Sequence, residues 1–386
     1  MTTPSGTPGE AIPRPLDHYL DTASAEPLHP AAREVLLAAL ERGYADPRRL
    51  HRQARDARLL LDNARAVVAE CLGARPDEVG FAASGTDAVH RGLLGLVRAQ
   101  RGTARTGVVH SAVEHSSVLH AVGWLDSPLH ASVPVDASAR VDPAAVDAAA
   151  RSDGVAVVAL QAANQEVGTV QPVDALDLPE RIPLFVDAAA AAGRIELPSR
   201  WDALAASARK FGGPAGVGVL VVRREVRWST PFPGDDGLDQ LGGDANVPGA
   251  LATAAALQAV LSEREETAAR QHELTDRIRR AVGSLPDTEV VGDPVDRLPH
   301  LVTFSCLYVA GDELVTALDR RGYGVASGSA CTASTLEPSH VLAAMGALTH
   351  GNVRVSLRRD STVAEVDGFC AAVADAVAEF RSGAGL

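Results

Sequence analysis

The stretch SARKFGGPAGVGVLVVR, residues 207–223, joins a glycine-rich turn to an uninterrupted apolar run. Residues 217–222 have the length and the valine-rich composition of a buried strand. Lys210 stands at the turn and is the single lysine among the 36 Lys and Arg residues. An amine can lose its proton and attack a carbonyl, whereas a guanidinium stays charged. The position therefore favours an imine-forming lysine at the edge of a core, although one lysine could also survive by chance.

Short β-rich runs alternate with alanine-rich helical segments around this stretch. The predicted strands are residues 79–83, 106–110, 155–160, 184–187 and 217–222, and the predicted helices include residues 87–97 and 143–151. This alternation indicates an α/β domain with a mainly parallel sheet. Ligands of such sheets bind at the carboxyl ends of the strands.

A change of pattern near residue 251 indicates two domains. A long helical stretch begins there and is followed by shorter mixed elements. We expect a large domain over residues 18–250 and a smaller C-terminal domain over residues 251–386, joined by residues 1–17. The chain has 386 residues and is 46% hydrophobic, which is enough for a large core.

Charge and cysteine content narrow the function classes. A net charge of −13 disfavours nucleic-acid binding, because phosphate binding needs a basic surface. Residues 1–15 lack the pattern of a secretory signal, and no apolar run is long enough to span a bilayer. We expect a cytoplasmic protein that binds neither nucleic acid nor membrane. The four cysteines show neither a disulfide framework nor metal-ligand spacing, so reduced thiols and no metal site are expected; they are Cys71, Cys306, Cys331 and Cys370.

Polar residues follow two of the predicted strands. Ser84 and Asp87 have capping-box spacing. The N–H groups of Gly85 and Thr86 would then either belong to a simple helix start or cradle a phosphate. Asp187 ends another strand shortly before Lys210, at a position where an acid is often only a turn former. A lysine, a carboxylate and a phosphate cradle are together what pyridoxal phosphate chemistry requires.

Five stretches carry a resemblance to a known family. They are EHSSV (114–118), NQEVGTVQP (164–172), VDAA (186–189), KFGGP (210–214) and SGSAC (327–331). In this order they resemble the cysteine desulfurases, which are class V, fold-type I pyridoxal phosphate enzymes, and the similarity extends from Tyr19 to Arg354. The resemblance implies a homodimer whose large domain holds a mainly parallel seven-stranded sheet. It also implies a smaller α+β domain that carries a catalytic-cysteine loop.

The resemblance assigns roles around the cofactor. Lys210 would bind it as an imine, and Asp187 would pair with its ring nitrogen. His115 would stack on the ring and move protons, and Asn164 would hydrogen-bond the ring hydroxyl. The phosphate would be held by Gly85, Thr86 and Ser207. Singly, such a histidine or asparagine is more often structural, and only their joint arrangement favours function.

Cys331 decides between members of the superfamily. Its SGSAC context predicts a mobile loop, which suits a thiol that must collect sulfur and carry it away, and the run CTASTLEPSHVLAAMG resembles the long-loop class. The resemblance implies that the Cys331 thiolate attacks the sulfur of L-cysteine, leaving L-alanine and an enzyme persulfide. The sulfur would then pass to an acceptor protein or pathway enzyme. By the same resemblance Arg354, with Asn164, grips the substrate carboxylate, although an exposed strand arginine would give the same pattern.

Four departures from the family pattern concern the cofactor site. They are Ala190 in place of a glutamine, Arg209 in place of a histidine, Leu241-Gly242-Gly243-Asp244 in place of Arg-x-Gly-Thr, and Ala25-Glu26 in place of a threonine pair. An unpaired buried aspartate beside a phosphate would cost several kcal/mol. We therefore expect Arg209 to bind the phosphate, with Asp244 paired to it.

Two other interpretations fit the same residues. One is a class V C–S lyase acting by β-elimination, or an aminotransferase, in which Cys331 is incidental. The other is a degenerate sulfur-relay or scaffold subunit without its own chemistry. Replacement of Cys331 by serine separates the first from a desulfurase, and failure to take up the cofactor would indicate the second.

Overall fold

The structure is a computed structural model that describes residues 18–233, 237–238, 241, 243, 245–327 and 338–383. The predictions for residues 1–17, for Gly242 and Asp244, and for residues 328–337, which include Cys331, lie outside these ranges.

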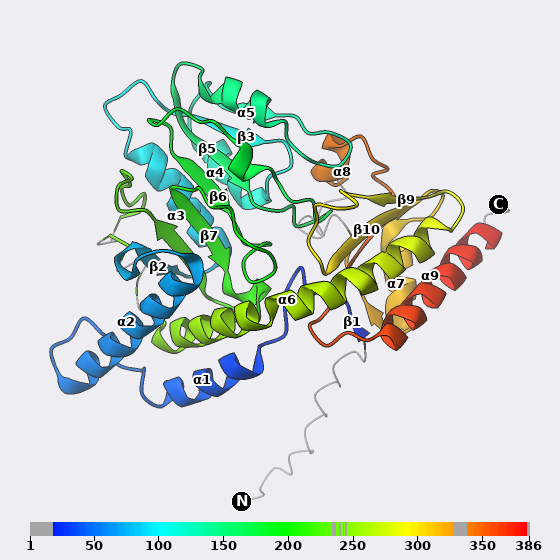
Figure 1. The fold of residues 1–386 in the computed structure, drawn as a ribbon, viewed down its shortest axis with the longest axis horizontal. Coiled ribbons are helices and arrows are strands. Elements are labelled where there is room, and N and C mark those ends of the chain that lie inside the picture. Colours follow the sequence, from blue (N-terminus) through cyan, green and yellow to red (C-terminus); the bar gives the residue numbers. More distant parts are fainter. Residues whose placement is uncertain are drawn as a thin grey trace, which may run out of the picture.

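A seven-stranded sheet forms the centre of the larger part of the molecule (Figure 1). Its order is β2-β8-β7-β6-β5-β3-β4; β8 pairs antiparallel with both neighbours, and the other pairs are parallel. The expected mainly parallel, seven-stranded sheet is confirmed. The strands are β2 (Val79–Ala82), β3 (Gly107–Ser111), β4 (Ala131–Val133), β5 (Val155–Gln161), β6 (Leu184–Asp187), β7 (Ala203–Ser207) and β8 (Gly218–Val222).

Helices cover both faces of this sheet. The sheet side chains of one face pack with α3 and α4, and those of the other face pack with α2, α5 and the first half of α6. Helix α1 lies against α6. The helices are α1 (Pro30–Leu40), α2 (Arg52–Leu72), α3 (Gly85–Arg98), α4 (Ser116–Trp124), α5 (Pro143–Ala150) and α6 (Val247–Gly283).

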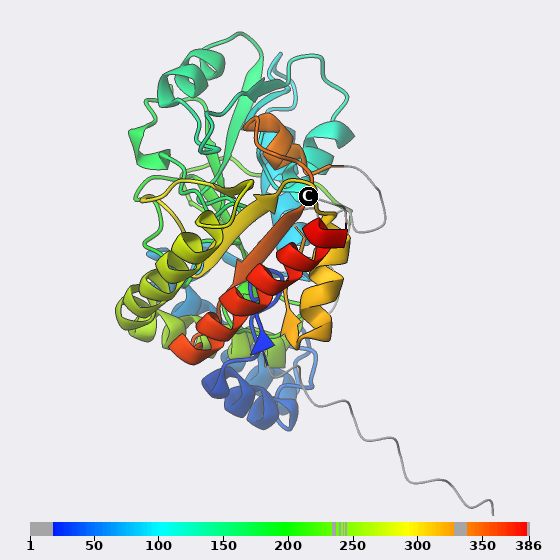
Figure 2. The ribbon, with the colours of Figure 1, turned by 90° about the vertical axis from the view of Figure 1, so that its right-hand side faces the viewer.

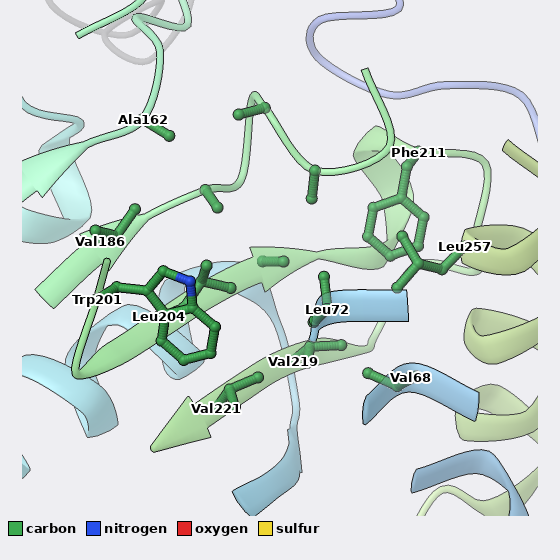
Figure 3. Close-up of a cluster of buried hydrophobic side chains, with 14 of the residues drawn as sticks. Val68, Leu72, Ala162, Val186, Trp201, Leu204, Phe211, Val219, Val221 and Leu257 are labelled. Atoms are coloured by element: carbon green, nitrogen blue, oxygen red, sulfur yellow. The ribbon is translucent and has the colours of Figure 1, made fainter. Parts of the chain in front are cut away.

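Burial on both faces explains the apolar run that follows the lysine turn. Val219 and Val221 pack on the side of α2 and α6, which Figure 3 shows in close-up. Leu220 and Val222 pack on the opposite side, against α3. Because successive side chains of a strand point to opposite faces, a strand covered on both sides needs apolar residues throughout.

A second core lies in the C-terminal part of the chain. Its three-stranded antiparallel sheet has the order β12-β10-β9 and lies beside α7 and α9 (Figure 2). Side chains from α7, α9 and the end of α6 pack with this sheet. Leu20, which follows β1, also belongs to this core. The remaining elements are β1 (His18–Tyr19), β9 (Thr288–Val291), β10 (Leu301–Cys306), α7 (Gly311–Arg320), β11 (Tyr323–Gly324), α8 (His340–Ala344), β12 (Asn352–Ser356) and α9 (Val363–Gly383).

Helix α6 contributes to both cores. Its 37 residues correspond to about 55 Å at 1.5 Å per residue. Side chains from Val247 to Val260 pack in the first core, and those from Leu274 to Val282 pack in the second. The predicted boundary at residue 251 falls inside this helix, so the division into two domains stays a prediction. Within the described ranges, no helix has both the length and the apolar character needed to cross a bilayer.

The close packing of α3 on the sheet depends on Gly92. A Cβ atom there would lie 2.5 Å from Cε2 of Phe185 and 2.9 Å from Cδ1 of Leu220. We expect Gly92→Ala to lower the free energy of unfolding by about 1–3 kcal/mol, because α3 must move off the sheet. In the matched control Gly123→Ala, at an exposed position of α4, the new Cβ meets nothing within 4 Å, and stability should rise by about 0.5–1 kcal/mol. Urea denaturation measures both, and equal responses would contradict this packing.

Candidate active site

A cavity of about 220 Å³ lies where the carboxyl ends of β5, β6 and β7 meet the N-terminus of α3. This is the edge at which ligands of parallel sheets bind. Seven of the predicted site residues line it: Gly85, Thr86, His115, Asp187, Ser207, Arg209 and Lys210. Residues from four separate stretches of the sequence are thus brought to one cavity.

The N-terminus of α3 forms one wall of the cavity. Ser84 is the N-cap, and its Oγ accepts a hydrogen bond from Asp87 N at 3.0 Å. Gly85 and Thr86 begin the helix, so their N–H groups have no intrahelical acceptor. A Cβ atom on Gly85 would lie 2.6 Å from Cβ and 2.9 Å from Oγ of Ser207. Glycine thus lets the helix N-terminus and the Ser207 hydroxyl come together, which makes an anion site.

Asp187 and Gln161 end neighbouring strands as register partners. Burial raises the pKa of the Asp187 carboxyl, and the hydrogen bond from Ala189 N (2.9 Å) and the charge of Lys210 partly offset the rise. Gln161 donates through Nε2 to Val113 O at 2.7 Å, and among the described residues nothing donates to its buried Oε1. Buried acceptors are normally paired, so this part of the wall fits a ligand that carries hydrogen-bond donors.

His115 is the N-cap of α4. Its Nδ1 accepts a hydrogen bond from Ser117 N at 3.1 Å and lies 2.7 Å from Ser117 Oγ. A backbone N–H can only donate, so Nδ1 is unprotonated and the neutral ring carries its proton on Nε2. Burial, reinforced by the charge of Lys210, lowers the pKa of His115 to about 3. The imidazole is therefore neutral at physiological pH.

Lys210 ends a short 3₁₀ turn, Ala208–Lys210, that follows β7. Gly212 then takes φ of +83°, in the left-handed region that favours glycine, and the chain returns along β8. The N-terminal segment holds this turn from outside: Glu26 N donates to Arg209 O and His29 N to Gly212 O, both at 2.8 Å. The expected lysine turn before a buried strand is confirmed.

The Arg209 side chain is tied to the same N-terminal segment. Its Nε and Nη2 donate to Ser24 O at 3.0 and 2.6 Å, while the residue lines the cavity. Asp244, its expected partner, lies outside the described residues. The contact of Arg209 with a phosphate stays a prediction.

Asn164 and Arg354 are not among the residues that line the cavity. The Asn164 amide donates to Val113 O at 3.1 Å and accepts from Glu166 N and Val167 N at 2.8 and 2.9 Å, so it holds its own turn. The buried guanidinium of Arg354 donates through Nη2 to Asp21 Oδ1 (2.9 Å) and Ser24 Oγ (2.7 Å), and through Nη1 to Gln165 O (3.1 Å). Their substrate contacts stay predictions.

Sequence reasoning missed three polar residues that line the cavity: Ser117, Gln161 and Gln165. Gln161 carried a usable signal, because it closes a buried strand as Asp187 does. The predicted strand stopped one residue short, at Leu160, and so left it out.

The three described cysteines have poorly nucleophilic thiols. Burial raises the pKa of Cys71 in α2 and of Cys370 in α9 to about 11, and it also raises the pKa of Cys306 in β10. Thiolates, not thiols, attack sulfur. Across the described ranges, no group of three or more His, Cys, Asp or Glu side chains is arranged to hold a metal ion.

Comparison with known proteins places this site in a family. Residues 18–369 match the family described as aminotransferase class-V. The chain is 37% identical to an IscS-like cysteine desulfurase of Mycobacterium tuberculosis over 95% of this chain and 98% of the relative. It is 36% identical to a cysteine desulfurase of Cereibacter sphaeroides, over 90% and 92%. The chain belongs to the cysteine desulfurase family, within the class-V aminotransferases.

A solved NifS-like protein has the same fold as this cysteine desulfurase family member. The TM-score is 0.86 at 25% identity, over 94% of this chain and 99% of that chain. Class-V aminotransferases generally use pyridoxal phosphate. The residues fit that cofactor, because an amine, a buried carboxylate and a helix N-terminus suited to an anion line the same cavity.

Glu114 lies next to His115 and is fully buried in this cysteine desulfurase family member. Its Oε1 accepts hydrogen bonds from Ser111 Oγ (2.6 Å) and Gln161 N (3.1 Å), and no described residue donates to Oε2. Burial raises the pKa of this carboxyl to about 8. The folded protein therefore favours a protonated Glu114 at neutral pH.

This raised pKa makes the stability depend on pH. The folded state binds the Glu114 proton up to about pH 8, whereas the unfolded chain releases it near pH 4.5, so the stabilisation present below pH 4.5 is lost as pH rises to 8. We expect the free energy of unfolding of Glu114→Gln, relative to that of the parent, to increase from pH 5 to pH 8 by at most about 1.4 kcal/mol per pH unit. Denaturant titrations at both pH values test this. A difference that does not change with pH would mean that the Glu114 pKa is ordinary.

Proposed function

We propose that this protein is a pyridoxal phosphate-dependent cysteine desulfurase, which removes sulfur from L-cysteine, releases L-alanine and passes the sulfur to an acceptor. One observation carries the proposal: a single cavity gathers the chain's one lysine, a buried carboxylate, a neutral imidazole and a helix N-terminus. Membership of the cysteine desulfurase family supports it independently.

Each group of the cofactor would have a binding residue in the cavity. Lys210 would hold the cofactor covalently through its amine, and Asp187 would accept a hydrogen bond from the pyridine nitrogen, whose positive charge would keep the carboxylate ionised. The phosphate would be bound by Gly85, Thr86 and Ser207, with Arg209 as a fourth proposed group. Bound pyridoxal phosphate withdraws electrons from the amino acid and so weakens its bond from Cβ to sulfur.

His115 is the proposed proton carrier. Its neutral ring has one proton, on Nε2, because Nδ1 accepts from Ser117 N. Its low pKa means that a proton gained from a substrate group is released again readily. The side chain of Ser117 and the start of α4 fix the ring in place.

Cys331 is the proposed sulfur acceptor on the enzyme. A bond forms between its thiolate sulfur and the sulfur of L-cysteine while the bond from that sulfur to Cβ breaks. The bonding electrons stay with Cβ, which takes a proton and becomes the methyl group of alanine, and Cys331 is left as a persulfide. No external oxidant is needed. The raised thiol pKa values of the described cysteines make them poor substitutes.

The remaining assignments are also proposals. Arg354, with Asn164, would bind the substrate carboxylate. We further propose a homodimer of two-domain subunits, in the cytoplasm, that delivers sulfur to a protein acceptor or pathway enzyme.

Product analysis tests the reaction. The cofactor-loaded protein, given L-cysteine and a thiol reductant, should release alanine and sulfide in equal amounts. Cys331→Ser should lower this turnover at least about 100-fold, because the attacking thiolate is lost, while the control Cys71→Ser should keep it. Pyruvate in place of alanine would instead indicate β-elimination, and full turnover by Cys331→Ser would show that Cys331 is incidental.

The single lysine allows a direct test of cofactor attachment. Borohydride reduction of the cofactor-loaded protein should fix one pyridoxyl group per chain, and peptide mass spectrometry should find it at Lys210. Lys210→Arg should carry none, because a guanidinium does not form an imine. A label elsewhere, or none on the parent protein, would overturn the assignment of Lys210.

A further inference from the structure

A buried ion pair lies directly beside the lysine turn. Glu26 Oε2 accepts a hydrogen bond from Arg194 Nη2 at 2.5 Å, and the two side chains are 3% and 7% exposed. Glu26 belongs to the N-terminal segment before α1, and Arg194 follows β6. Glu26 is also one of the positions at which the sequence departs from the family pattern. An ion pair this deeply buried needs further polar partners to offset its desolvation.

One such partner is on the lysine turn, since Arg194 Nη2 also donates to Lys210 O at 3.2 Å. The main-chain N–H of Glu26, separately from its carboxylate, donates to Arg209 O at 2.8 Å. Consecutive carbonyl groups, one of them that of Lys210 itself, are therefore bound by the two members of the pair. The backbone from which the Lys210 side chain extends cannot shift without breaking these bonds.

The network continues away from the turn. Arg359, after β12, lies 4.0 Å from Glu26 Oε1 and 3.2 Å from Glu263 Oε2 of α6. Glu263 in turn lies 3.4 Å from His29 Nε2, and His29 N donates to Gly212 O at 2.8 Å. The polar chain thus begins and ends on the lysine turn and passes through α6 on the way.

The Glu26–Arg194 pair also contributes to the balance of charges around the lysine turn. Burial lowers the pKa of His300 well below its usual range, and the charges of Arg194, Arg354 and Lys210 lower it further. The charges of these three cations therefore all act on one buried imidazole. Asp187 offsets Lys210 at the cavity, Asp21 offsets Arg354, and Glu26 offsets Arg194.

We infer that Glu26 and Arg194 are positioning residues for Lys210: together they fix the backbone of the lysine and keep the charge beside it balanced. The inference rests on the proposed function, in which Lys210 holds the cofactor. Removal of one member leaves the charge of the other unbalanced beside the lysine. Removal of both restores neutrality but leaves the turn less firmly held.

The test is the pH dependence of the visible absorption of the cofactor bound to Lys210. In Glu26→Gln the unbalanced Arg194 should disfavour a proton near the lysine and lower the midpoint of this titration by about half a pH unit. In Arg194→Met the unbalanced Glu26 should raise it, and the double variant should return towards the parent value. Shifts of opposite sign cannot come from a general loss of stability.

A matched control is Glu78→Gln. The Glu78 side chain is also 3% exposed, lies 3.4 Å from Arg223 and accepts from Arg224 N at 2.9 Å. It adjoins the end of β8 opposite to the lysine turn. This variant should lower the Tm as Glu26→Gln does, but it should leave the absorption midpoint unchanged.

The outcomes separate the inference from the proposed function. Parent protein that never forms the Lys210 adduct would overturn the proposed function. A parent that forms it, with unchanged midpoints in both single variants, would overturn the inference and make the pair purely structural. Should Arg194→Met not fold, Arg194→Lys is the second variant, because it keeps the charge. It should preserve the absorption midpoint and speed the exchange of the cofactor with a competing amine at least about threefold. An unchanged exchange rate would count against a positioning role.

Discussion

The structure depends on the burial of both faces of its seven-stranded sheet. Residues of β8 point alternately into two apolar layers, as Val219 and Leu220 do. A polar side chain in the middle of that strand would therefore be buried among apolar groups and lose its hydration. In β5, β6 and β7 the polar side chains accordingly stand only at the carboxyl ends. Asp187, Gln161 and Ser207 each end a strand, and the cavity forms where those ends lie together.

Close contacts at that edge make the cavity suitable for an anionic, amine-reactive ligand. Gly85 lets the N-terminus of α3 approach the Ser207 hydroxyl beside the lysine turn, which is an arrangement suited to an anion. The same edge holds His115 in its neutral form and Asp187 under the charge of Lys210. Family membership and local chemistry thus support the same function, although they rest on separate observations.

The N-terminal segment connects the lysine turn to the rest of the molecule. Ser24 accepts from Arg209 through its carbonyl and from Arg354 through its hydroxyl, while Glu26 binds Arg194. Arg354 belongs to β12 of the second core, so residues of both cores meet on this short segment. A change in the relative position of the cores would act on the lysine turn through these bonds.

Much of the chemistry could be predicted from the sequence, because it depends on residue identity and on local pattern. The single lysine, the alternation of β-rich and helical runs and the capped start of the helix after Ser84 are local features, and the motif order identified the family. Strand β7 escaped prediction because its sequence, ALAAS, is alanine-rich and becomes a strand only between β6 and β8.

Only the tertiary structure decided which polar groups satisfy one another. Glu26 and Arg194 are far apart in the sequence, and their buried pair on the lysine turn has no local signal. The hydrogen bond from the Arg354 guanidinium to Asp21 also has no local signal. Nor does the burial that raises the pKa of Glu114. The physical reason is that desolvation and pairing depend on three-dimensional surroundings, whereas strand and helix patterns and motif chemistry are already present along the chain.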